Sequence, residues 1–293
     1  MAVYPSVFEA KEQIVEIGKR MYAKNMVVSN DGNISCRISP DEILATPTGV
    51  SKGFMHRDML VRMTLDGEAA GYNEYKPSSE VKMHLRVYKE NPDAVAVVHA
   101  HPLYATSFAI AGIGLDQPIL TETIMSLGSV PVARYATPGT QEVPDSIAPF
   151  CTKYNAVLMA NHGALTWGDS LMQAYHRMES VEYYANIIFN TGYIIGQSNK
   201  LSCEQVGPLM DIRARLGVSG GGQPACSPQT MNDRDVLPAT GPLKECSGCC
   251  RSGMCETAQQ NGAAPTDGRQ DTEKLIEQIT REVIENLKKA GLR

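Results

Sequence analysis

Apolar residues follow two different periods along the first 200 residues. Between residues 6 and 24, Ile14, Ile17 and Met21 recur at helical spacing among charged residues, which predicts an amphipathic first helix. Residues 95–102 instead form an unbroken apolar run, mostly β-branched, that ends in two histidines and a proline, a pattern typical of a buried strand. Further strands are predicted over 34–38, 42–46, 60–64, 130–134 and 156–159, and further helices over 76–90, 103–110 and 170–191.

Strands and helices interleave in this prediction, but several strands are separated only by short turns, such as 30–33 and 39–41. Strands joined by so few residues pair antiparallel, because parallel pairs need a long crossover. We therefore predict an α/β fold: a three-layer sandwich in which helices flank a mixed, largely antiparallel central sheet. A doubly wound parallel sheet is not expected.

The character of the chain changes near residue 206. From 206 to 270 it is dominated by Gly, Pro, Ser, Asn, Gln and Asp, a composition that buries too little apolar surface to form a core. Near the end of the chain, four aliphatic residues share one face of an amphipathic helix: Ile276, Ile279, Val283 and Leu287. Three parts are predicted: a catalytic domain over 1–205, a flexible linker over 206–270 and a helix over 271–293.

Composition argues against several classes of function. The 293 residues carry a formal net charge of −5 and no Lys/Arg-rich run, so nothing indicates a nucleic-acid partner. Apolar runs stay far below the roughly 20 residues that a membrane span needs. No hydrophobic segment of a signal peptide follows the N-terminus, so we expect a cytoplasmic protein with no membrane partner.

Six of the eight cysteines lie beyond residue 200. In a reducing compartment they are not expected to form a disulfide framework. Cys246, Cys249, Cys250 and Cys255 are spaced closely enough to bind zinc or an iron–sulfur cluster, but the surrounding composition provides no core to hold such a site. A structural metal site and free thiols in a linker both stay open.

Two histidines at the end of the strand predicted over 95–102 indicate a metal site. Residues i and i+2 of a strand point to the same face, so His99 and His101 project together where Pro102 ends the pairing. Taken alone, the pair is explained equally well by hydrogen-bonded core histidines. However, His162 follows another predicted strand and Glu80 begins a helix, and three imidazoles with a carboxylate suit Zn²⁺. The remaining histidines are expected on the surface or in packing: His56, His84 and His176.

Three loops rich in small polar residues point to a phosphorylated ligand. They contain Gly32-Asn33, Thr48-Gly49 and Ser78-Ser79, and each carries backbone N–H groups and short side-chain donors. The last loop precedes a helix, whose N-terminus favours an anion and which either serine can cap. Turns use the same residues, so each loop alone is a weak signal. No Walker-type lysine pattern is present, and we expect no nucleotide.

Six motifs then occur in the order expected for one known family. They are Gly32-Asn33-Ile34-Ser35, Thr46-Pro47-Thr48-Gly49, Lys76-Pro77-Ser78-Ser79-Glu80, His99-Ala100-His101-Pro102, Tyr135-Ala136-Thr137-Pro138-Gly139-Thr140 and Asn161-His162-Gly163. Over residues 6–195 the chain thereby resembles the class II aldolase/adducin family, and within it most of all the L-fuculose-1-phosphate aldolases.

The resemblance implies a homotetramer with active sites near subunit boundaries. It implies a Zn²⁺ held by His99, His101 and His162, with Glu80 binding the metal in the free site and acting as acid and base. It implies that three loops hold the substrate phosphate: Gly32, Asn33, Thr48, Gly49, Ser78 and Ser79. The expected reaction is reversible cleavage of L-fuculose 1-phosphate, or of L-rhamnulose 1-phosphate, to dihydroxyacetone phosphate and L-lactaldehyde.

The residue types fit this reaction. Cleavage of a ketose 1-phosphate develops an enediolate, whose charge a Lewis-acidic Zn²⁺ stabilises. A carboxylate is then needed to move protons, and Glu80 fits that role once substrate displaces it from the metal. No Schiff-base lysine is required, so Lys52 and Lys76 are expected at the surface or behind the site.

One position departs from the family pattern. Fuculose-phosphate aldolases carry a tyrosine proton donor in the segment that here reads Leu120-Thr121-Glu122-Thr123-Ile124, and Glu122 stands at or near its place. Glu122 either replaces the tyrosine as catalytic acid, as acidic residues do in related dehydratases, or is unrelated to it. The chain after Leu201 also differs from the family, which leaves the aldehyde specificity open.

Three other functions stay open. An L-ribulose-5-phosphate 4-epimerase would use the same metal frame, but the epimerases of this family carry Asp where Glu80 stands. A sugar-phosphate dehydratase is favoured by Glu122. An adducin-like scaffold would need no catalytic groups, and the presence of Glu80 with all three histidines argues against it.

The isolated helix over 271–293 has two interpretations. It resembles the encapsulation peptides that target enzymes to bacterial microcompartments, where a short amphipathic helix docks on shell or cargo proteins by its apolar face. It is also compatible with an oligomer-packing or coiled-coil segment. On the first interpretation the enzyme lies in the lumen of a microcompartment rather than free in the cytoplasm.

Overall fold

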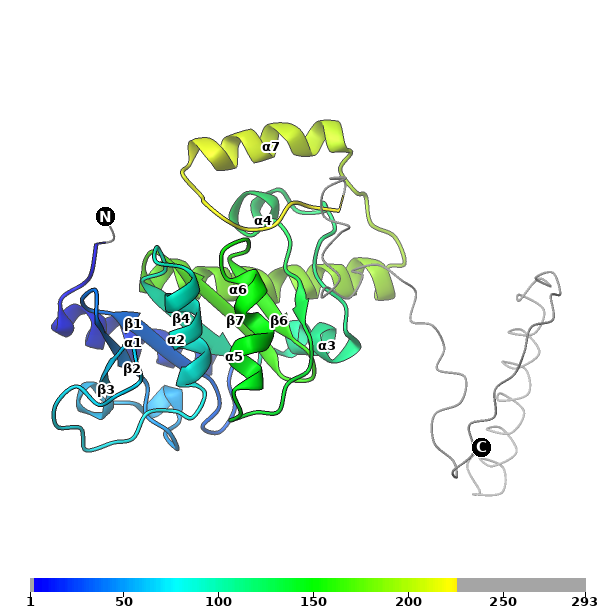
Figure 1. The fold of residues 1–293 in the computed structure, drawn as a ribbon. Helices are drawn as coiled ribbons and strands as arrows, with labels where there is room; N and C mark the ends of the chain where they lie inside the picture. The colour runs from blue at the N-terminus through cyan, green and yellow to red at the C-terminus, as the bar shows by residue number, and fades with distance from the viewer. Residues whose placement is uncertain (1–2, 226–293) are drawn as a thin grey trace, which may run out of the picture. The chain divides into compact units, whose positions relative to one another are not determined.

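The computed structural model describes residues 3–225, which fold around one seven-stranded sheet. Its strands are β1 (Asn33–Arg37), β2 (Glu42–Ala45), β3 (Val61–Thr64), β4 (Ala96–Ala100), β5 (Val132–Ala133), β6 (Ala156–Met159) and β7 (Gly163–Gly168). They lie in the order β3-β2-β1-β4-β7-β6-β5, and every neighbouring pair is antiparallel except β5 and β6 (Figure 1). The predicted α/β fold with a mixed, largely antiparallel sheet is confirmed.

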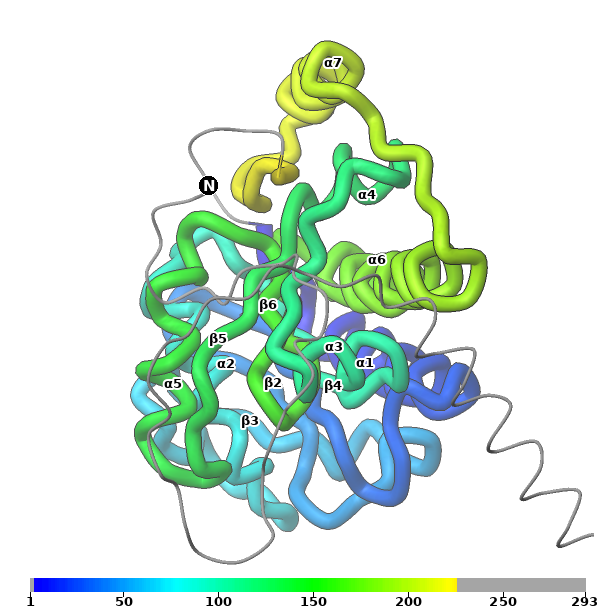
Figure 2. Tube along the Cα trace, turned by 90° about the vertical axis from the view of Figure 1, so that its right-hand side faces the viewer, coloured from blue at the N-terminus to red at the C-terminus, as the bar shows by residue number. Residues whose placement is uncertain are grey.

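Helices cover both faces of this sheet. The helices of residues 3–225 are α1 (Val7–Ala23), α2 (Val81–Glu90), α3 (Leu103–Ala111), α4 (Thr121–Ser126), α5 (Glu142–Ile147), α6 (Leu171–Phe189) and α7 (Cys203–Arg215). Figure 2 shows α2 and α5 on one side of the strands and α1, α3 and α6 on the other. The described residues therefore form the three layers that the sequence predicts.

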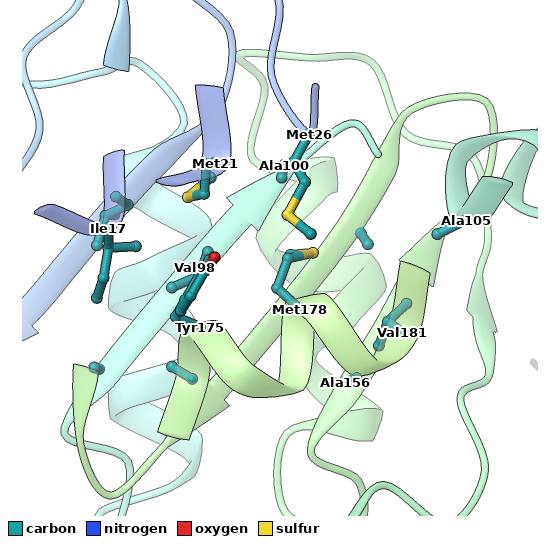
Figure 3. Packing of buried hydrophobic residues seen from close by; sticks show 14 of the residues in the cluster. Ile17, Met21, Met26, Val98, Ala100, Ala105, Ala156, Tyr175, Met178 and Val181 are labelled. Carbon is teal, nitrogen blue, oxygen red and sulfur yellow. The ribbon is translucent and has the colours of Figure 1, made fainter. Parts of the chain in front are cut away.

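One hydrophobic core lies between the sheet and the layer of α1, α3 and α6. The apolar stripe of α1 is fully buried there, as its helical spacing predicts. Met178 and Val181 of α6 belong to this core together with Val98 of β4 (Figure 3). Each of these side chains is 0% exposed, and truncating a buried methionine to alanine costs about 2–5 kcal/mol.

A second core lies on the opposite face, under α2 and α5. Val97 of β4 belongs to this core, together with Met83 and Val87 of α2 and Ile147 of α5. Because Val97 and Val98 point to opposite faces and both faces are covered, β4 is apolar at almost every position. The same alternation directs His99 toward the α2 side of the sheet.

Three local features differ from the sequence prediction. Strand β7 was not expected, although it forms the hairpin partner of β6 and also pairs with β4. Helix α2 begins at Val81, and its N-cap is Glu80 without a side-chain capping bond, so the predicted serine cap is wrong. Instead, the hydroxyl of Ser78 accepts the backbone N–H of Glu80 at 3.3 Å, which keeps the serine within the loop.

The described structure continues past residue 205. Helix α7 crosses that position and packs beside α4, and the chain is described to Ala225. Residues 226–293 lie outside the described part, and with them the four closely spaced cysteines and the helix predicted over 271–293. Within residues 3–225, no helix is long and apolar enough to span a membrane.

Candidate active site

Three histidines meet at the end of β4. His99 and His101 come from the strand and its exit, and His162 comes from the turn between β6 and β7. One ring nitrogen of each lies within 4.8 Å of the others. His99 is fully buried, whereas His101 and His162 are half-buried, so the cluster opens to solvent on one side.

Hydrogen bonds fix the orientation of two of these rings. Nδ1 of His99 donates to the carbonyl of Ala164 at 2.9 Å, and Nδ1 of His101 lies 3.5 Å from the carboxylate of Asp31. Burial lowers the pKa of His99 well below 6.5 and also lowers that of His101, so both rings are neutral at pH 7. With the proton on Nδ1, each ring turns the lone pair of Nε2 toward the other.

This arrangement fits a bound metal ion. The two Nε2 atoms of His99 and His101 are 3.0 Å apart. Two unprotonated nitrogens at that distance repel each other unless a cation lies next to both. Nitrogen ligands of a tetrahedral Zn²⁺ at 2.0–2.1 Å lie about 3.3 Å from one another. The backbone and carboxylate partners on Nδ1 are also the outer contacts typical of metal-binding histidines.

Glu80 joins this cluster from the start of α2. Its Oε1 lies 2.9 Å from Nε2 of His162, and its Oε2 lies 3.7 Å from Nε2 of His99. The amide of Asn33 donates to Oε2 at 2.7 Å. Burial alone raises the pKa of this carboxyl, but the hydrogen bonds from His162 and Asn33 outweigh burial and hold the pKa below 4.5. Glu80 is therefore an anion placed to bind a metal or to accept a proton.

Two glycines allow the strands to approach at this point. A Cβ at residue 163 would lie 2.5 Å from the carbonyl oxygen of Ala100 and 2.6 Å from the ring of His101. Gly32 has φ = +74°, and a Cβ there would lie 2.9 Å from the carbonyl oxygen of His99. Any larger residue at these positions pushes β1 or β7 away from β4 and separates the side chains of the cluster.

The three predicted phosphate loops converge beside Glu80. The N–H of Thr48 donates to the carbonyl of Lys76 at 2.9 Å, and the N–H of Ser78 donates to that of Thr46 at 3.3 Å. The amide of Asn33 also reaches the hydroxyl of Ser78 at 3.4 Å. Residues 32–33, 48–49 and 78–79 thus border one region at the N-terminus of α2, where backbone N–H groups favour an anion.

Lys52 lies under two of these loops and not at the surface. Its side chain is 1% exposed, and Nζ donates to the carbonyls of Asn30 at 2.8 Å and Val50 at 2.7 Å. Burial lowers its pKa to about 8, although Asp31 and Glu80 oppose that effect. One ammonium group therefore connects the loop that carries Gly32 and Asn33 with the loop that carries Thr48 and Gly49.

Glu122 lies apart from the contacts described above. It belongs to the short helix α4, is exposed, and accepts a hydrogen bond from the hydroxyl of Thr121 at 2.9 Å. Backbone and Thr121 hydrogen bonds lower its pKa below 4.5. None of the contacts of Glu122 within residues 3–225 joins it to the histidines.

Sequence reasoning missed two polar residues of this region, Asp31 and His84, and one contact of the predicted residue Asn33. Asp31 orients His101, Asn33 holds Glu80 as well as bordering the phosphate loops, and His84 contacts Asn33 from inside α2. His84 was expected only on the surface or in packing. A detectable signal was the spacing of Glu80, His84 and Tyr88, which places three polar groups on one face of a helix.

A comparison with known families agrees with the site geometry. Residues 12–189 match the class II aldolase and adducin N-terminal domain. The chain belongs to this family. Its class II aldolases and decarboxylases are lyases that act on sugar phosphates, and the enzyme class predicted from the sequence is thereby confirmed.

Individual relatives differ in their reactions. A 3-oxo-tetronate 4-phosphate decarboxylase from Pectobacterium atrosepticum is 33% identical over 188 residues, covering 62% of this chain and 85% of its own. An L-fuculose phosphate aldolase from Methanocaldococcus jannaschii is 30% identical over 178 residues, 60% of this chain and 94% of its own. Among solved structures, YgbL of Klebsiella pneumoniae is similar with a TM-score of 0.65 at 32% identity, over 70% of this chain and 99% of its own.

Proposed function

We propose that the chain is a zinc-dependent aldolase that reversibly cleaves L-fuculose 1-phosphate, L-rhamnulose 1-phosphate or both to dihydroxyacetone phosphate and L-lactaldehyde. One observation carries this proposal: an ionised carboxylate, Glu80, lies 2.9 Å from one of three clustered histidines. A metal site and a proton carrier in contact are what this cleavage needs. His99, His101 and His162 would hold the metal, with Glu80 as a fourth ligand before substrate binds.

The loops beside Glu80 would bind the phosphate of the substrate. Backbone N–H groups near Gly32, Gly49 and Ser79, with the hydroxyls of Thr48 and Ser78, can donate to phosphate oxygens. The buried ammonium of Lys52 adds positive charge beneath two of these loops. Phosphate binding at this place would position the carbonyl end of the substrate toward the histidines.

Glu80 would then move a proton on the substrate. In the cleavage direction the bond between C3 and C4 breaks, its electron pair passes toward the C2 carbonyl, and C3 must be protonated. A bound Zn²⁺ supplies the Lewis acid that stabilises negative charge developing on the substrate oxygens. As an anion, Glu80 is placed to remove the proton from C3 in the direction of synthesis; in the cleavage direction it would first take up a proton from solvent and then deliver it to C3.

Glu122 is our candidate for the second proton carrier. The hydroxyl at C4 must lose its proton during cleavage, and Glu80 serves the other half of the substrate. Within residues 3–225 Glu122 has no contact with the histidines, so this role requires a neighbouring subunit, as in the predicted homotetramer, whose α4 approaches the site. Exchange of Glu122 for glutamine would then lower kcat without changing Zn²⁺ affinity.

Decarboxylation of a phosphorylated 3-oxo acid is the second candidate. It is favoured by the 33% identity with a 3-oxo-tetronate 4-phosphate decarboxylase. The same metal and Glu80 would serve it, because loss of CO₂ also leaves negative charge beside a carbonyl. Decarboxylation requires no base at a C4 hydroxyl, and Glu122 would then be dispensable.

Product analysis separates these candidates. Purified full-length protein is supplied with a panel of ketose 1-phosphates, ribulose 5-phosphate and phosphorylated 3-oxo acids, with and without a chelator. We expect dihydroxyacetone phosphate and L-lactaldehyde, and loss of both with the chelator. Release of CO₂ alone would establish the decarboxylase, and turnover that survives complete removal of metal would refute the metal-dependent mechanism.

The remaining proposal concerns the rear of the chain. We propose that the chain beyond α7, the rest of the linker predicted over 206–270, ends in a helix over 271–293 that targets the enzyme to the lumen of a bacterial microcompartment by docking on shell or cargo proteins. Its support is the amphipathic pattern of the sequence. Deletion of residues 271–293 should leave the activity intact and abolish co-sedimentation with shells, and loss of activity instead would contradict targeting.

A further inference from the structure

Helix α2 and strand β1 face each other with polar side chains at matched intervals. Glu80, His84 and Tyr88 recur every four residues on α2, a spacing of about 6 Å along the helix axis. Asn33 and Ser35 lie two residues apart on β1, a spacing of about 6.8 Å along the strand. The two periods nearly coincide, so the side chains of one element can meet those of the other in succession.

These side chains form one continuous series of hydrogen bonds. The phenol of Tyr88 and the hydroxyl of Ser35 are 2.7 Å apart, and the same hydroxyl lies 2.7 Å from Nδ1 of His84. Nε2 of His84 contacts the amide oxygen of Asn33. The amide nitrogen of Asn33 then donates to Glu80 at 2.7 Å. Asn33 and the three residues behind it are no more than 2% exposed, so no bulk water competes with these contacts.

The hydrogen bond from Asn33 to Glu80 fixes which group donates in every other bond of this series. Because Asn33 uses its NH₂ group on the Glu80 carboxylate, its oxygen faces His84 and must accept, so His84 carries its proton on Nε2. Burial lowers the pKa of His84 to about 3, which keeps the ring neutral, and Nδ1 must therefore accept from Ser35. Ser35 has no second proton, so Tyr88 donates to it. All donors point toward Glu80.

We propose that Tyr88, Ser35 and His84 are positioning residues that hold the amide of Asn33 in the orientation that donates to Glu80. The inference rests on the proposed function, because it assigns these residues a task at the same site. A reversed amide would turn its oxygen toward the carboxylate and repel it. Bonds aligned in one direction strengthen one another, so the phenol affects Glu80 across three intervening groups.

A purely structural network is the competing explanation. In that case the buried hydrogen bonds stabilise the packing of α2 on β1, and their loss lowers the free energy of unfolding without changing the site. The two explanations differ in how two substitutions combine. If Tyr88 acts on Glu80 only through Ser35, then removing Ser35 already removes the effect of Tyr88. The double variant should therefore lose no more Zn²⁺ affinity than Ser35→Ala alone.

The test uses full-length protein with Tyr88→Phe, Ser35→Ala and the double variant. Tyr184→Phe is the matched control, because it removes another buried phenol, which donates to the carbonyl of Gln117. Zn²⁺ affinity is measured by competition with a chelating dye, and kcat and KM are measured on the sugar phosphate that the wild type cleaves. Urea unfolding shows whether each variant is folded.

We expect Tyr88→Phe to weaken Zn²⁺ binding and to lower kcat, each about three- to tenfold, with KM unchanged. Ser35→Ala should have a larger effect, the double variant should equal Ser35→Ala, and Tyr184→Phe should match the wild type in all three values. Zn²⁺ affinity in Tyr88→Phe equal to that of the control would overturn the proposal. A double variant whose fold-loss of Zn²⁺ affinity is the product of the two single fold-losses would also overturn it, because the two residues would then act independently.

These outcomes separate the inference from the proposed function. If the variants show the expected series in Zn²⁺ affinity but the wild type cleaves no sugar phosphate, the positioning role stands and the aldolase proposal fails. If the wild type cleaves its substrate and Tyr88→Phe binds Zn²⁺ as tightly as the wild type, the aldolase proposal stands and the positioning role fails. A wild-type protein that binds no Zn²⁺ would refute both.

Discussion

Replacing Lys52 by methionine removes a buried cation while keeping an unbranched side chain of similar length. Lys52 is 1% exposed, and burial lowers its pKa from 10.5 to about 8. Between these two pH values the unfolded chain binds a proton at Lys52 that the folded chain has released. The free energy of unfolding of the wild type therefore rises with pH in this window, and the Lys52→Met variant lacks this contribution.

The size of the effect follows from the two pKa values. Each unit of difference corresponds to about 1.36 kcal/mol, so keeping Lys52 protonated in the folded state costs about 3 kcal/mol below pH 8. The cost is mostly gone near pH 10, where the amine is neutral in the folded protein. The difference in unfolding free energy between wild type and Lys52→Met should thus move in favour of the wild type by about 2 kcal/mol from pH 7.5 to pH 10.

Urea denaturation at several pH values measures this difference directly. Subtracting the variant from the wild type removes the contributions of tyrosines, cysteines and other lysines that titrate in the same range. Lys76→Met, at an exposed position, reports what the loss of one surface charge does by itself. A difference between wild type and Lys52→Met that stays constant with pH would refute a desolvated ammonium under the loops.

Gly163→Ala should lower the free energy of unfolding by more than about 2 kcal/mol and weaken Zn²⁺ binding, because its Cβ would lie 2.5 Å from the carbonyl oxygen of Ala100. Gly207→Ala, in open space on α7, should instead stabilise by up to about 1 kcal/mol in the same urea assay. Glu182→Ala should cost about 1–2 kcal/mol by thermal unfolding, because its carboxylate accepts the first free N–H groups of α3. A chelator should lower the thermal midpoint of the wild type and leave that of His162→Ala unchanged; equal shifts in both proteins would contradict metal binding at the histidines.

The sheet and the histidine cluster could be predicted because their signals are local. His99 and His101 share a strand, and their common face follows from a period of two residues. Strand β7 lacked such a signal, because its sequence from Gly163 to Gly168 mixes small, polar and aromatic residues and is buried only through β4 and β6. Pairing on both sides decides its conformation more than its own composition does.

The partners of His84 on β1 could not be predicted from its neighbours in the chain. Its partners Ser35 and Asn33 are 49 and 51 residues away, and the register of β1 against β4 decides that both face α2. The serine cap failed for a related reason. Glu80 occupies the N-cap position, and its side chain contacts His162 and Asn33. The first residue of the helix is therefore determined by contacts in the site, which the local capping preference does not reveal.

The position of β4 in the sheet has a consequence for how the chain can vary. β4 is the middle strand of seven, with three strands on each side, and β1 and β7 flank it directly. Fraying or insertion at the outer strands β3 and β5 therefore leaves at least one intact strand between the disturbance and the histidines. Backbone amides of β4 should exchange with solvent among the slowest in residues 3–225. Changes in the loops at the sheet edges should therefore disturb the histidine cluster less than changes in β1, β4 or β7.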